Sequence, residues 1–348
     1  MKLKTIACAA LAAVMGLGAV TAQAEEEKKV NLFFWPGYIP DELLARFTKE
    51  TGIEITMDIY DTNEALLAKL QAGAAGYDVV IPSGYIVPTM VEQGLLQKFD
   101  LKTLPNGGNI APAFADPEFD RGRQYTAPYM WGTTGLVYDS AKAGGELPNS
   151  WSVFFEPGAL SGKVAALDDE VEVFNAAAYY LGFDKCTEDP KEGQKILDLL
   201  MKQKPELLLY GSSGTIDRVL AGEVAMHHIW NGAAHRVRNK METARYIYPK
   251  EGITQWADNL SIPTSAAHPE NAKIFINFLM DPKNVAEITN FTGYMNAIAG
   301  SEEFLKPEIA ADPAVNMPAE FAERLRPGRE CSPAARDLRN RVWTRLKK

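Results

Sequence analysis

The sequence has few of the residues that build metal centres or disulfide frameworks. It contains four histidines and three cysteines in 348 residues, and none of them lie at metal-ligand spacing. His227 and His228 are neighbours, so in a strand they would point to opposite faces and could not chelate one ion together. His235 and His268 each stand alone. We expect no metal site.

Sequence motifs of common enzyme classes are missing too. The chain has no Gly-x-Ser-x-Gly, no Walker loop and no G-x-G-x-x-G. Neither Cys186 nor Cys331 has a nucleophile–base motif around it. Tyr179 and Tyr180 could suggest ferric-ion capture, but adjacent helical positions diverge by about 100°, which favours core packing. We therefore expect a protein that is not an enzyme and that uses no cofactor.

The only long apolar run lies at the N-terminus. Lys2 and Lys4 precede the apolar residues 6–20, and an Ala22-Gln23-Ala24 sequence follows. This order is typical of a cleavable secretory signal in residues 1–24, and its apolar part is too short to anchor the chain in a bilayer. Cys8 is not preceded by a lipobox, so we expect no lipid anchor. The mature chain would begin at Glu25.

Acidic residues outnumber basic residues in this chain. Removing Lys2 and Lys4 from the 36 Lys and Arg leaves 34 against 45 Asp and Glu, a mature net charge of −11. This balance disfavours nucleic acid as a partner and mildly favours a cationic ligand. The mature length is sufficient for two domains. Cys186 and Cys331 could pair in an oxidising compartment, and the sequence leaves that pairing open.

The N-terminal part of the mature chain alternates strands with helices. Strands are expected over residues 30–34, 53–60 and 77–81, with helices over 40–51 (stopped by Gly52) and about 63–71. This order predicts a parallel sheet, in which ligands gather at the carboxyl ends of the strands. Aromatic and hydroxyl groups occur at these ends, in Trp35-Pro36-Gly37-Tyr38 and Ser83-Gly84-Tyr85.

A second α/β unit is expected after Trp131-Gly132. Its elements are strands over 163–167 and 224–230 and helices over about 171–181 and 190–202, and later helices cover 269–280 and 334 to the end. The first unit resumes near Trp256. A chain that crosses between two domains more than once creates a cleft and a hinge.

Two clusters suggest a site for an organic cation. In an extended segment, Trp256 and Asp258 share one face, where the indole offers cation–π attraction and the carboxylate a charge-assisted hydrogen bond. The alternative is a core tryptophan and a turn-capping aspartate. Asp168, Asp169, Glu170 and Glu172 form a second cluster at a strand-to-helix junction. These acids can be explained as helix caps, although they exceed what capping needs.

Several segments together resemble a known family. They are Phe47-Thr48-Lys49-Glu50-Thr51-Gly52-Ile53, Tyr77-Asp78-Val79-Val80-Ile81-Pro82-Ser83, Pro128-Tyr129-Met130-Trp131-Gly132, Ile229-Trp230-Asn231-Gly232, Pro249-Lys250-Glu251-Gly252, Trp256-x-Asp258 and Thr292-Gly293-Tyr294. Over nearly the whole mature chain, the sequence resembles the periplasmic polyamine-binding proteins of ABC importers, of the spermidine/putrescine type.

This resemblance implies a ligand box with aromatic walls and carboxylates. The aromatic positions are Trp35, Tyr38, Tyr85, Trp230, Trp256 and Tyr294; the acids are Asp169, Glu172 and Asp258; the hydroxyls are Ser83 and Ser212. Two positions depart from the family pattern. Pro36 and Gly37 stand where a hydroxyl and an acid are typical, and Glu330 aligns with a familiar Gln and could restore an acid.

The resemblance also implies an architecture and a role. The fold would be α/β, of the type II periplasmic-binding-protein class. One lobe would be residues 25–132 with about 257–303, and the other residues 133–256 with about 304–348, with a hinge near Trp131-Gly132 and Asp258. The expected protein is a monomeric periplasmic receptor that delivers a polyamine to an inner-membrane ABC permease. The alternatives are a receptor for a membrane sensor and a same-fold binder of another solute, such as a metal or a guanidinium compound.

Overall fold

The structure is a computed structural model that describes residues 26–73 and 76–348. The expected signal segment, residues 1–24, lies outside the described residues. No helix in the described part of the chain is both long and apolar enough to cross a membrane.

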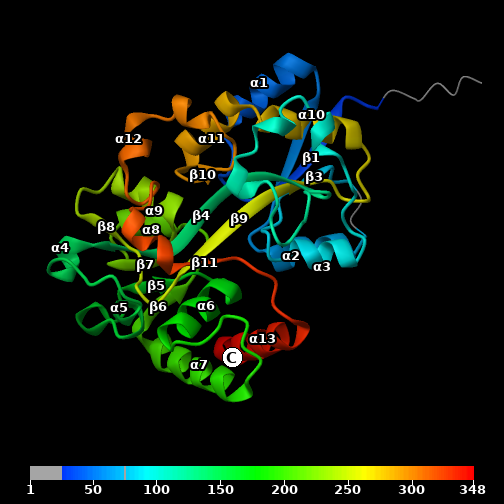
Figure 1. The fold of residues 1–348 in the computed structure, drawn as a ribbon. Helices are drawn as coiled ribbons and strands as arrows, with labels where there is room; N and C mark the ends of the chain where they lie inside the picture. Colours follow the sequence, from blue (N-terminus) through cyan, green and yellow to red (C-terminus); the bar gives the residue numbers. More distant parts are fainter. Residues whose placement is uncertain (1–25, 74–75) are drawn as a thin grey trace, which may run out of the picture.

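Strands and helices alternate along most of the chain (Figure 1). The strands are β1 (Lys29–Phe34), β2 (Glu54–Ile59), β3 (Val79–Val80), β4 (Thr126–Asp139), β5 (Val164–Ala166), β6 (Leu207–Tyr210), β7 (Met226–Trp230), β8 (Ala244–Ile247), β9 (Ile253–Ser261), β10 (Met295–Asn296) and β11 (Leu325–Pro327). The helices are α1 (Asp41–Thr51), α2 (Asn63–Gln71), α3 (Val87–Glu92), α4 (Ser140–Ala143), α5 (Ser152–Phe155), α6 (Glu170–Tyr180), α7 (Pro190–Gln203), α8 (Thr215–Leu220), α9 (Asn231–Arg238), α10 (Pro269–Leu279), α11 (Pro282–Thr292), α12 (Pro307–Ala311) and α13 (Pro333–Lys347). Short 3-10 turns complete the connections.

Local signals explain most of these boundaries. Helix α1 begins after Pro40, has Asp41 and Glu42 in its first turn, and ends at Gly52, whose φ of 71° is left-handed. Helix α7 begins at Pro190 after an Asp189 cap, and α6 begins after an Asp169 cap. The expected helices over 40–51, 63–71, 171–181, 190–202, 269–280 and 334 to the end are confirmed to within one or two residues.

All strands join one sheet with the order β2-β1-β3-β9-β4-β7-β5-β6. The expected parallel pairing of the first three strands is confirmed, since β1 pairs in parallel with both β2 and β3. Strands β10 and β8 pair with β4, and β11 pairs with β9. The two long antiparallel strands β4 and β9 run side by side through the centre of the molecule (Figure 1).

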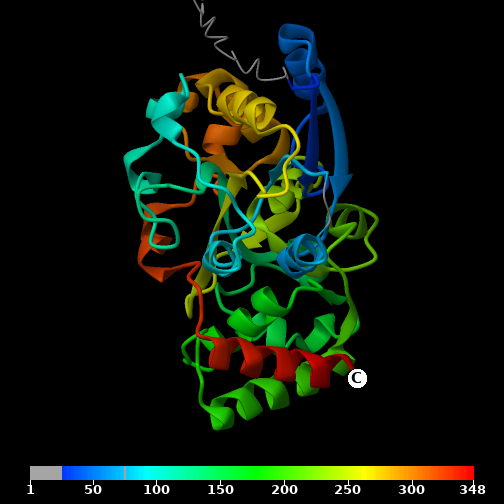
Figure 2. The same ribbon diagram turned by 90° about the vertical axis from the view of Figure 1, so that its right-hand side faces the viewer.

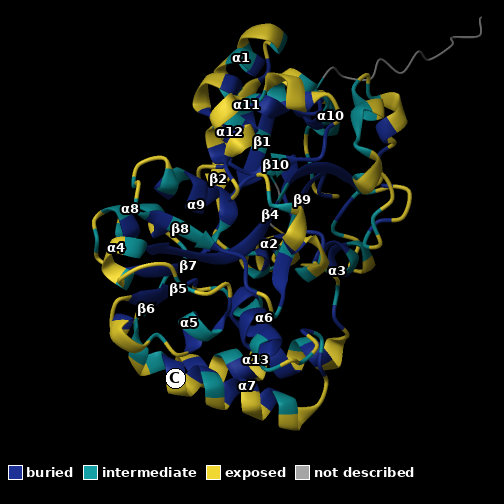
Figure 3. Ribbon diagram, turned by 60° about the vertical axis from the view of Figure 1, so that its left-hand side comes forward, coloured by how far each residue is buried: buried dark blue, intermediate teal, exposed yellow. Residues whose placement is uncertain are grey.

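Two large hydrophobic cores lie at opposite ends of these central strands. One contains Phe34, Phe47 and Phe275 from β1, α1 and α10, and the other contains Trp151, Phe174 and Leu346. Figure 2 shows α13 crossing the molecule next to α7, at the second core. In Figure 3 the central strands are buried, and the exposed positions gather on helices such as α7. The chain passes between the cores through β4 and β9, and again through the segment before α13.

Some expected strands differ in extent. The strand expected over 77–81 pairs only over Val79–Val80, and the next pairing is an isolated bridge from Ser83 to Asp258. Pro82 has no N–H for a ladder bond, which shortens this strand. Strand β4 was not expected as one unit. It runs unbroken from Thr126 to Asp139, through the expected boundary at Trp131-Gly132.

Candidate functional site

A cavity of about 780 Å³ lies between the two cores. Its walls come from the segments that follow β1, β2 and β3, from the start of α6, from residues 212–217, from the end of β7 and from β9. The carboxyl ends of the first three parallel strands therefore all contribute to it, as expected for an α/β sheet. Its volume is sufficient for a small organic molecule.

Asp258 is the buried acid at the core of this site. Its carboxylate accepts a hydrogen bond from Tyr38 Oη at 2.7 Å and another from Ser83 Oγ at 2.6 Å. Asn63 fixes Ser83 through two further hydrogen bonds at 3.0 Å. Burial raises the pKa of Asp258 to about 6, and the two hydroxyl donors oppose that rise. In the described part of the chain, no Lys, Arg or His nitrogen lies within 4.0 Å of this carboxylate.

Trp256 and Asp258 both line the cavity from β9, which confirms the extended segment with a shared face. The Trp256 ring meets Tyr294 edge-on, with ring centroids 5.0 Å apart. Tyr294 in turn packs edge-on against Tyr38, with ring centroids 5.6 Å apart. Trp35 closes another part of the wall, where its Nε1 donates to the Ile81 carbonyl at 3.0 Å. These locked rings form a rigid apolar surface beside Asp258.

The acidic cluster at the start of α6 has both the capping role and a place in the cavity. Asp169 accepts from the backbone N–H groups of Val171 and Glu172 at 2.9 and 3.0 Å, so it is the helix cap. Asp169, Glu170 and Glu172 also line the cavity. Asp168 does not; it forms an ion pair with Lys347 at 2.8 Å.

Glu172 lies deep in this cluster. Its Oε1 accepts from Thr134 Oγ1 at 2.9 Å, while its Oε2 is buried and has no partner among the described residues. Burial, and then the charge of Asp169, raise the pKa of Glu172 to about 8. The pKa of Asp169 rises to about 7 through burial and the charge of Glu64. Burial thus outweighs the helix dipole, which would lower both values.

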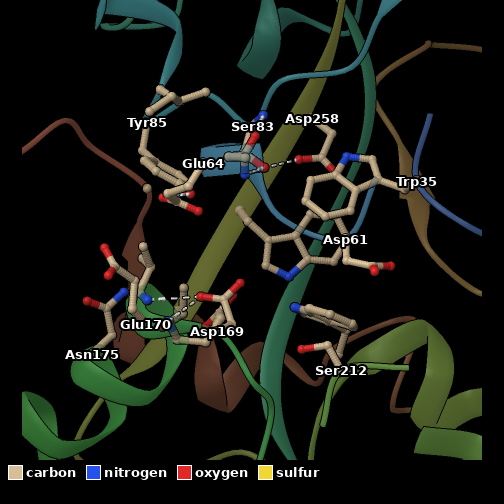
Figure 4. Close-up of a pocket in the computed structure, with 18 of the residues that line it drawn as sticks. Trp35, Asp61, Glu64, Ser83, Tyr85, Asp169, Glu170, Asn175, Ser212 and Asp258 are labelled. Atoms are coloured by element: carbon tan, nitrogen blue, oxygen red, sulfur yellow. Dashed lines mark hydrogen bonds between the residues drawn. The ribbon is translucent and has the colours of Figure 1, made fainter. Parts of the chain in front are cut away.

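Eleven of the twelve site residues expected from the sequence line the cavity. They are Trp35, Tyr38, Ser83, Tyr85, Asp169, Glu172, Ser212, Trp230, Trp256, Asp258 and Tyr294. Tyr85 donates to Glu64 at 3.1 Å, and Ser212 Oγ accepts from the Asp168 N–H at 3.0 Å. Figure 4 shows Asp258 and Ser83 in one part of the cavity and Asp169 and Glu170 in another.

Glu330 is the exception. It is not among the residues that line the cavity; its carboxylate accepts from Thr89 at 2.8 Å and forms an ion pair with Arg336 at 2.7 Å. The alignment that suggested an acid in the box at this position gave no information on these neighbours, which come from α3 and α13.

The sequence interpretation missed several lining residues. Asp61 follows β2 and Glu64 lies in the first turn of α2, and both line the cavity. Ligands gather at the carboxyl ends of parallel strands, and Asp61 follows the second strand just as Trp35 and Ser83 follow the first and third. The same reasoning therefore predicts Asp61. Arg236 on α9 also lines the cavity, and no sequence signal marked it.

The remaining chemistry-bearing residues are placed elsewhere. Cys186 and Cys331 form a disulfide, with Cα atoms 5.1 Å apart, which settles a pairing the sequence left open. His228 is buried and packs edge-on against Trp151, with centroids 5.5 Å apart. Burial lowers its pKa to about 3 and that of His227 to about 4, so both are neutral. Tyr179 packs in the second core, as expected.

The fold and the site define a class of protein. Two α/β units joined by crossing strands, with an aromatic and acidic cavity between them, are the features of a receptor that encloses a small solute. The chain belongs to the family of bacterial extracellular solute-binding proteins, whose model matches residues 42–319.

Individual proteins similar to this chain agree with the family assignment. The chain is 34% identical over 343 residues to the putrescine-binding periplasmic protein SpuD of Pseudomonas aeruginosa (strain UCBPP-PA14), covering 94% of each. It is 34% identical over 310 residues to the spermidine/putrescine-binding periplasmic protein of Escherichia coli (strain K12), covering 89% of each. The solved structure of a putative spermidine/putrescine ABC transporter from Listeria monocytogenes superposes with a TM-score of 0.87 at 27% identity. That match covers 92% of this chain and 99% of the other. These relatives have the two-lobed type II periplasmic-binding-protein fold, as the sequence led us to expect.

Proposed function

We propose that this protein is a periplasmic receptor that captures a polyamine in the cavity and delivers it to an ABC permease in the inner membrane. The printed names of the relatives, which bind putrescine or spermidine, support the class of ligand. The observation that carries the proposal is Asp258, a buried carboxylate with two hydroxyl donors and no cation near it among the described residues.

A buried carboxylate without a counter-ion is unfavourable, and a bound ammonium group removes that cost. Trp256 and Trp35 supply aromatic faces beside Asp258 for cation–π attraction and for contact with methylene groups. Asp169 and Glu172 offer a second anionic position in the cavity, and Figure 4 shows Asp169 apart from Asp258. Two anionic positions along an apolar wall match a flexible carbon chain with ammonium groups at intervals.

Capture would require the two lobes to close. We assign residues 25–132 with about 257–303 to one lobe and 133–256 with about 304–348 to the other, in keeping with the two hydrophobic cores. The hinge would lie in β4 and β9, near Trp131-Gly132 and Asp258. A Cβ at Gly132 would lie 2.3 Å from Asn231 Oδ1 and 2.5 Å from the Trp256 ring, so this crossing admits only glycine without rearrangement.

The proposal is tested by calorimetric titration of the mature chain with putrescine, spermidine, cadaverine and agmatine, with amino acids as controls. We expect Asp258→Asn to lose about 10- to 100-fold in affinity for any amine that binds, because a charge-assisted hydrogen bond is lost. Its melting temperature should not fall, since asparagine can still bond with Tyr38 and Ser83.

Asp217→Asn is the matched control. Asp217 lines the same cavity but is exposed, so its loss should change affinity less than about threefold, as for a screened charge. Binding of no amine would contradict the proposed ligand class, and unchanged affinity in Asp258→Asn would contradict the role of that carboxylate.

A further inference from the structure

Arg236 is a cation in a cavity whose buried charged groups are mainly carboxylates. It lies on α9, lines the cavity and is half-buried. Among residues 26–73 and 76–348, no carboxylate lies within 4.0 Å of its guanidinium, and its buried Nε has no hydrogen-bond partner. An arginine stays charged in a protein, so this group needs an acceptor.

Neighbouring arginines do have such acceptors. Arg238, two residues further along α9, forms an ion pair with Asp312 at 3.1 Å. Arg339, which also lines the cavity, pairs with Glu170 at 3.3 Å. Asp61 lines the cavity as well but is exposed and makes no ion pair with Arg236. Carboxylates thus neutralise Arg238 and Arg339, whereas Arg236 lines the cavity with no carboxylate within 4.0 Å among the described residues.

The position of Arg236 is defined by Gly37 and Tyr294. A Cβ at Gly37 would lie 4.0 Å from Arg236 Nη1, so the guanidinium lies against this turn. Tyr294 is close enough that the positive charge of Arg236, together with a side-chain hydrogen bond from it, opposes the rise in the Tyr294 pKa that burial causes. Tyr294 also contacts Trp256, whose indole N–H is buried without a partner in the described structure.

Among the described residues, the two groups near Tyr294 that lack a partner, Arg236 Nε and Trp256 Nε1, are both N–H donors. Ammonium groups are donors only, so a simple diamine or triamine cannot accept a bond from either of them. A carboxylate can accept both, and it forms short, paired hydrogen bonds with a guanidinium. A ligand that satisfies all of these groups has a hydrogen-bond acceptor near Arg236 and Trp256 and ammonium groups near the carboxylates of the cavity.

We propose, on the basis of the amine-receptor function above, that the preferred ligand is an amine chain ending in a carboxylate. Its ammonium groups meet Asp258 and the Asp169–Glu172 pair, and its carboxylate meets Arg236. An ω-amino acid has one ammonium group and can meet one of these acidic positions, whereas a carboxylated polyamine has two or more and can meet both. Arg236 is then the residue that determines specificity at the Gly37 end of the cavity.

Calorimetry with matched ligand pairs tests this inference. One pair is putrescine and 4-aminobutanoate; the other is spermidine and N-(3-aminopropyl)-4-aminobutanoate, in which a carboxylate replaces a terminal aminomethyl group. We expect the carboxylated member of at least one pair to bind about 10-fold tighter or more. The pair that shows this preference identifies the length. Arg236→Gln should weaken that ligand about 10- to 100-fold and leave its diamine or triamine counterpart unchanged or tighter.

Lys240→Gln removes the same charge from the exposed rim of the cavity and serves as the control. It should change all affinities by less than about threefold. Tighter binding of the simple amine in both pairs, or equal effects of the two substitutions, would overturn the inference while leaving the amine-receptor function in place. Binding of no ligand from either pair would overturn both.

Discussion

At the scale of single residues, burial in the cavity raises the pKa of carboxyl groups. Their ionisation is therefore unfavourable in the ligand-free site and becomes favourable when a cation binds. Glu172 has a pKa of about 8 in the folded chain against an ordinary value of 4.5. Between these values the folded state holds a proton that the unfolded state has lost. The free energy of unfolding of the ligand-free protein therefore falls as pH rises from about 4.5 to 8.

Glu172→Gln mimics the protonated side chain and should remove most of this dependence. We expect the ligand-free variant to match the parent near pH 5 and to be more stable by about 1–3 kcal/mol at pH 8, by urea unfolding. The variant should also bind amines more weakly. Glu188→Gln, at an exposed acid away from the cavity, provides the comparison. Equal pH slopes in parent and Glu172→Gln chains would rule out this account.

Several residues of the site could be predicted because they follow a strand end or begin a helix. Trp35, Ser83 and Asp169 are examples, and their local sequence identifies those ends. Arg236 could not be predicted, because nothing in α9 distinguishes it from Arg238, which pairs with an aspartate 74 residues away. Only the fold shows which of these two arginines has a carboxylate partner among the described residues.

At the scale of elements, the Cys186–Cys331 disulfide attaches the segment before α13 to the loop after α6. It closes a sequence separation of 145 residues, and Cys331 is buried and lines the cavity. Its Lys185 neighbour, also largely buried, donates to the Pro327 carbonyl. The loop and the C-terminal segment are therefore held together covalently and by hydrogen bonds.

Replacing both cysteines by serine should lower the free energy of unfolding by about 2–4 kcal/mol, because the unfolded chain gains freedom over a long loop. Thermal unfolding of the parent with and without a reductant should give the same difference. If the double variant and the reduced parent have the same melting temperature as the oxidised parent, the disulfide does not stabilise the fold in this way.

Helix and strand positions were more predictable than strand lengths for a related reason. Caps such as Pro40 and Gly52 are local, so α1 was placed within one or two residues. The extent of β4 depends on its partners β7, β8 and β9, which follow it much later in the chain. Pairings over such distances leave no signature within the strand itself.

At the scale of the molecule, Glu330 joins parts of the chain that belong to different cores. Thr89 lies on α3, whose neighbours Val87 and Met90 pack with β3, while Arg336 lies on α13, which packs in the second core. The carboxylate of Glu330 holds both, at 2.8 and 2.7 Å. This contact would favour the closed arrangement of the lobes without touching the ligand.

The contact of Glu330 with Thr89 and Arg336 would act as a latch between the two lobes. A double-mutant cycle distinguishes this role from the alternative in which Glu330 binds the ligand. If Glu330 acts through Thr89, Glu330→Gln and Thr89→Val should each weaken amine binding by about 3- to 10-fold, mainly through faster dissociation. Together they should weaken it no more than Glu330→Gln alone, because Thr89 acts only through the Glu330 carboxylate that this variant has already lost. A ligand ammonium on Glu330 would instead make the two losses multiply. Stopped-flow dissociation rates of the four proteins distinguish the cases, and unchanged rates in both single variants would exclude a latch at this position.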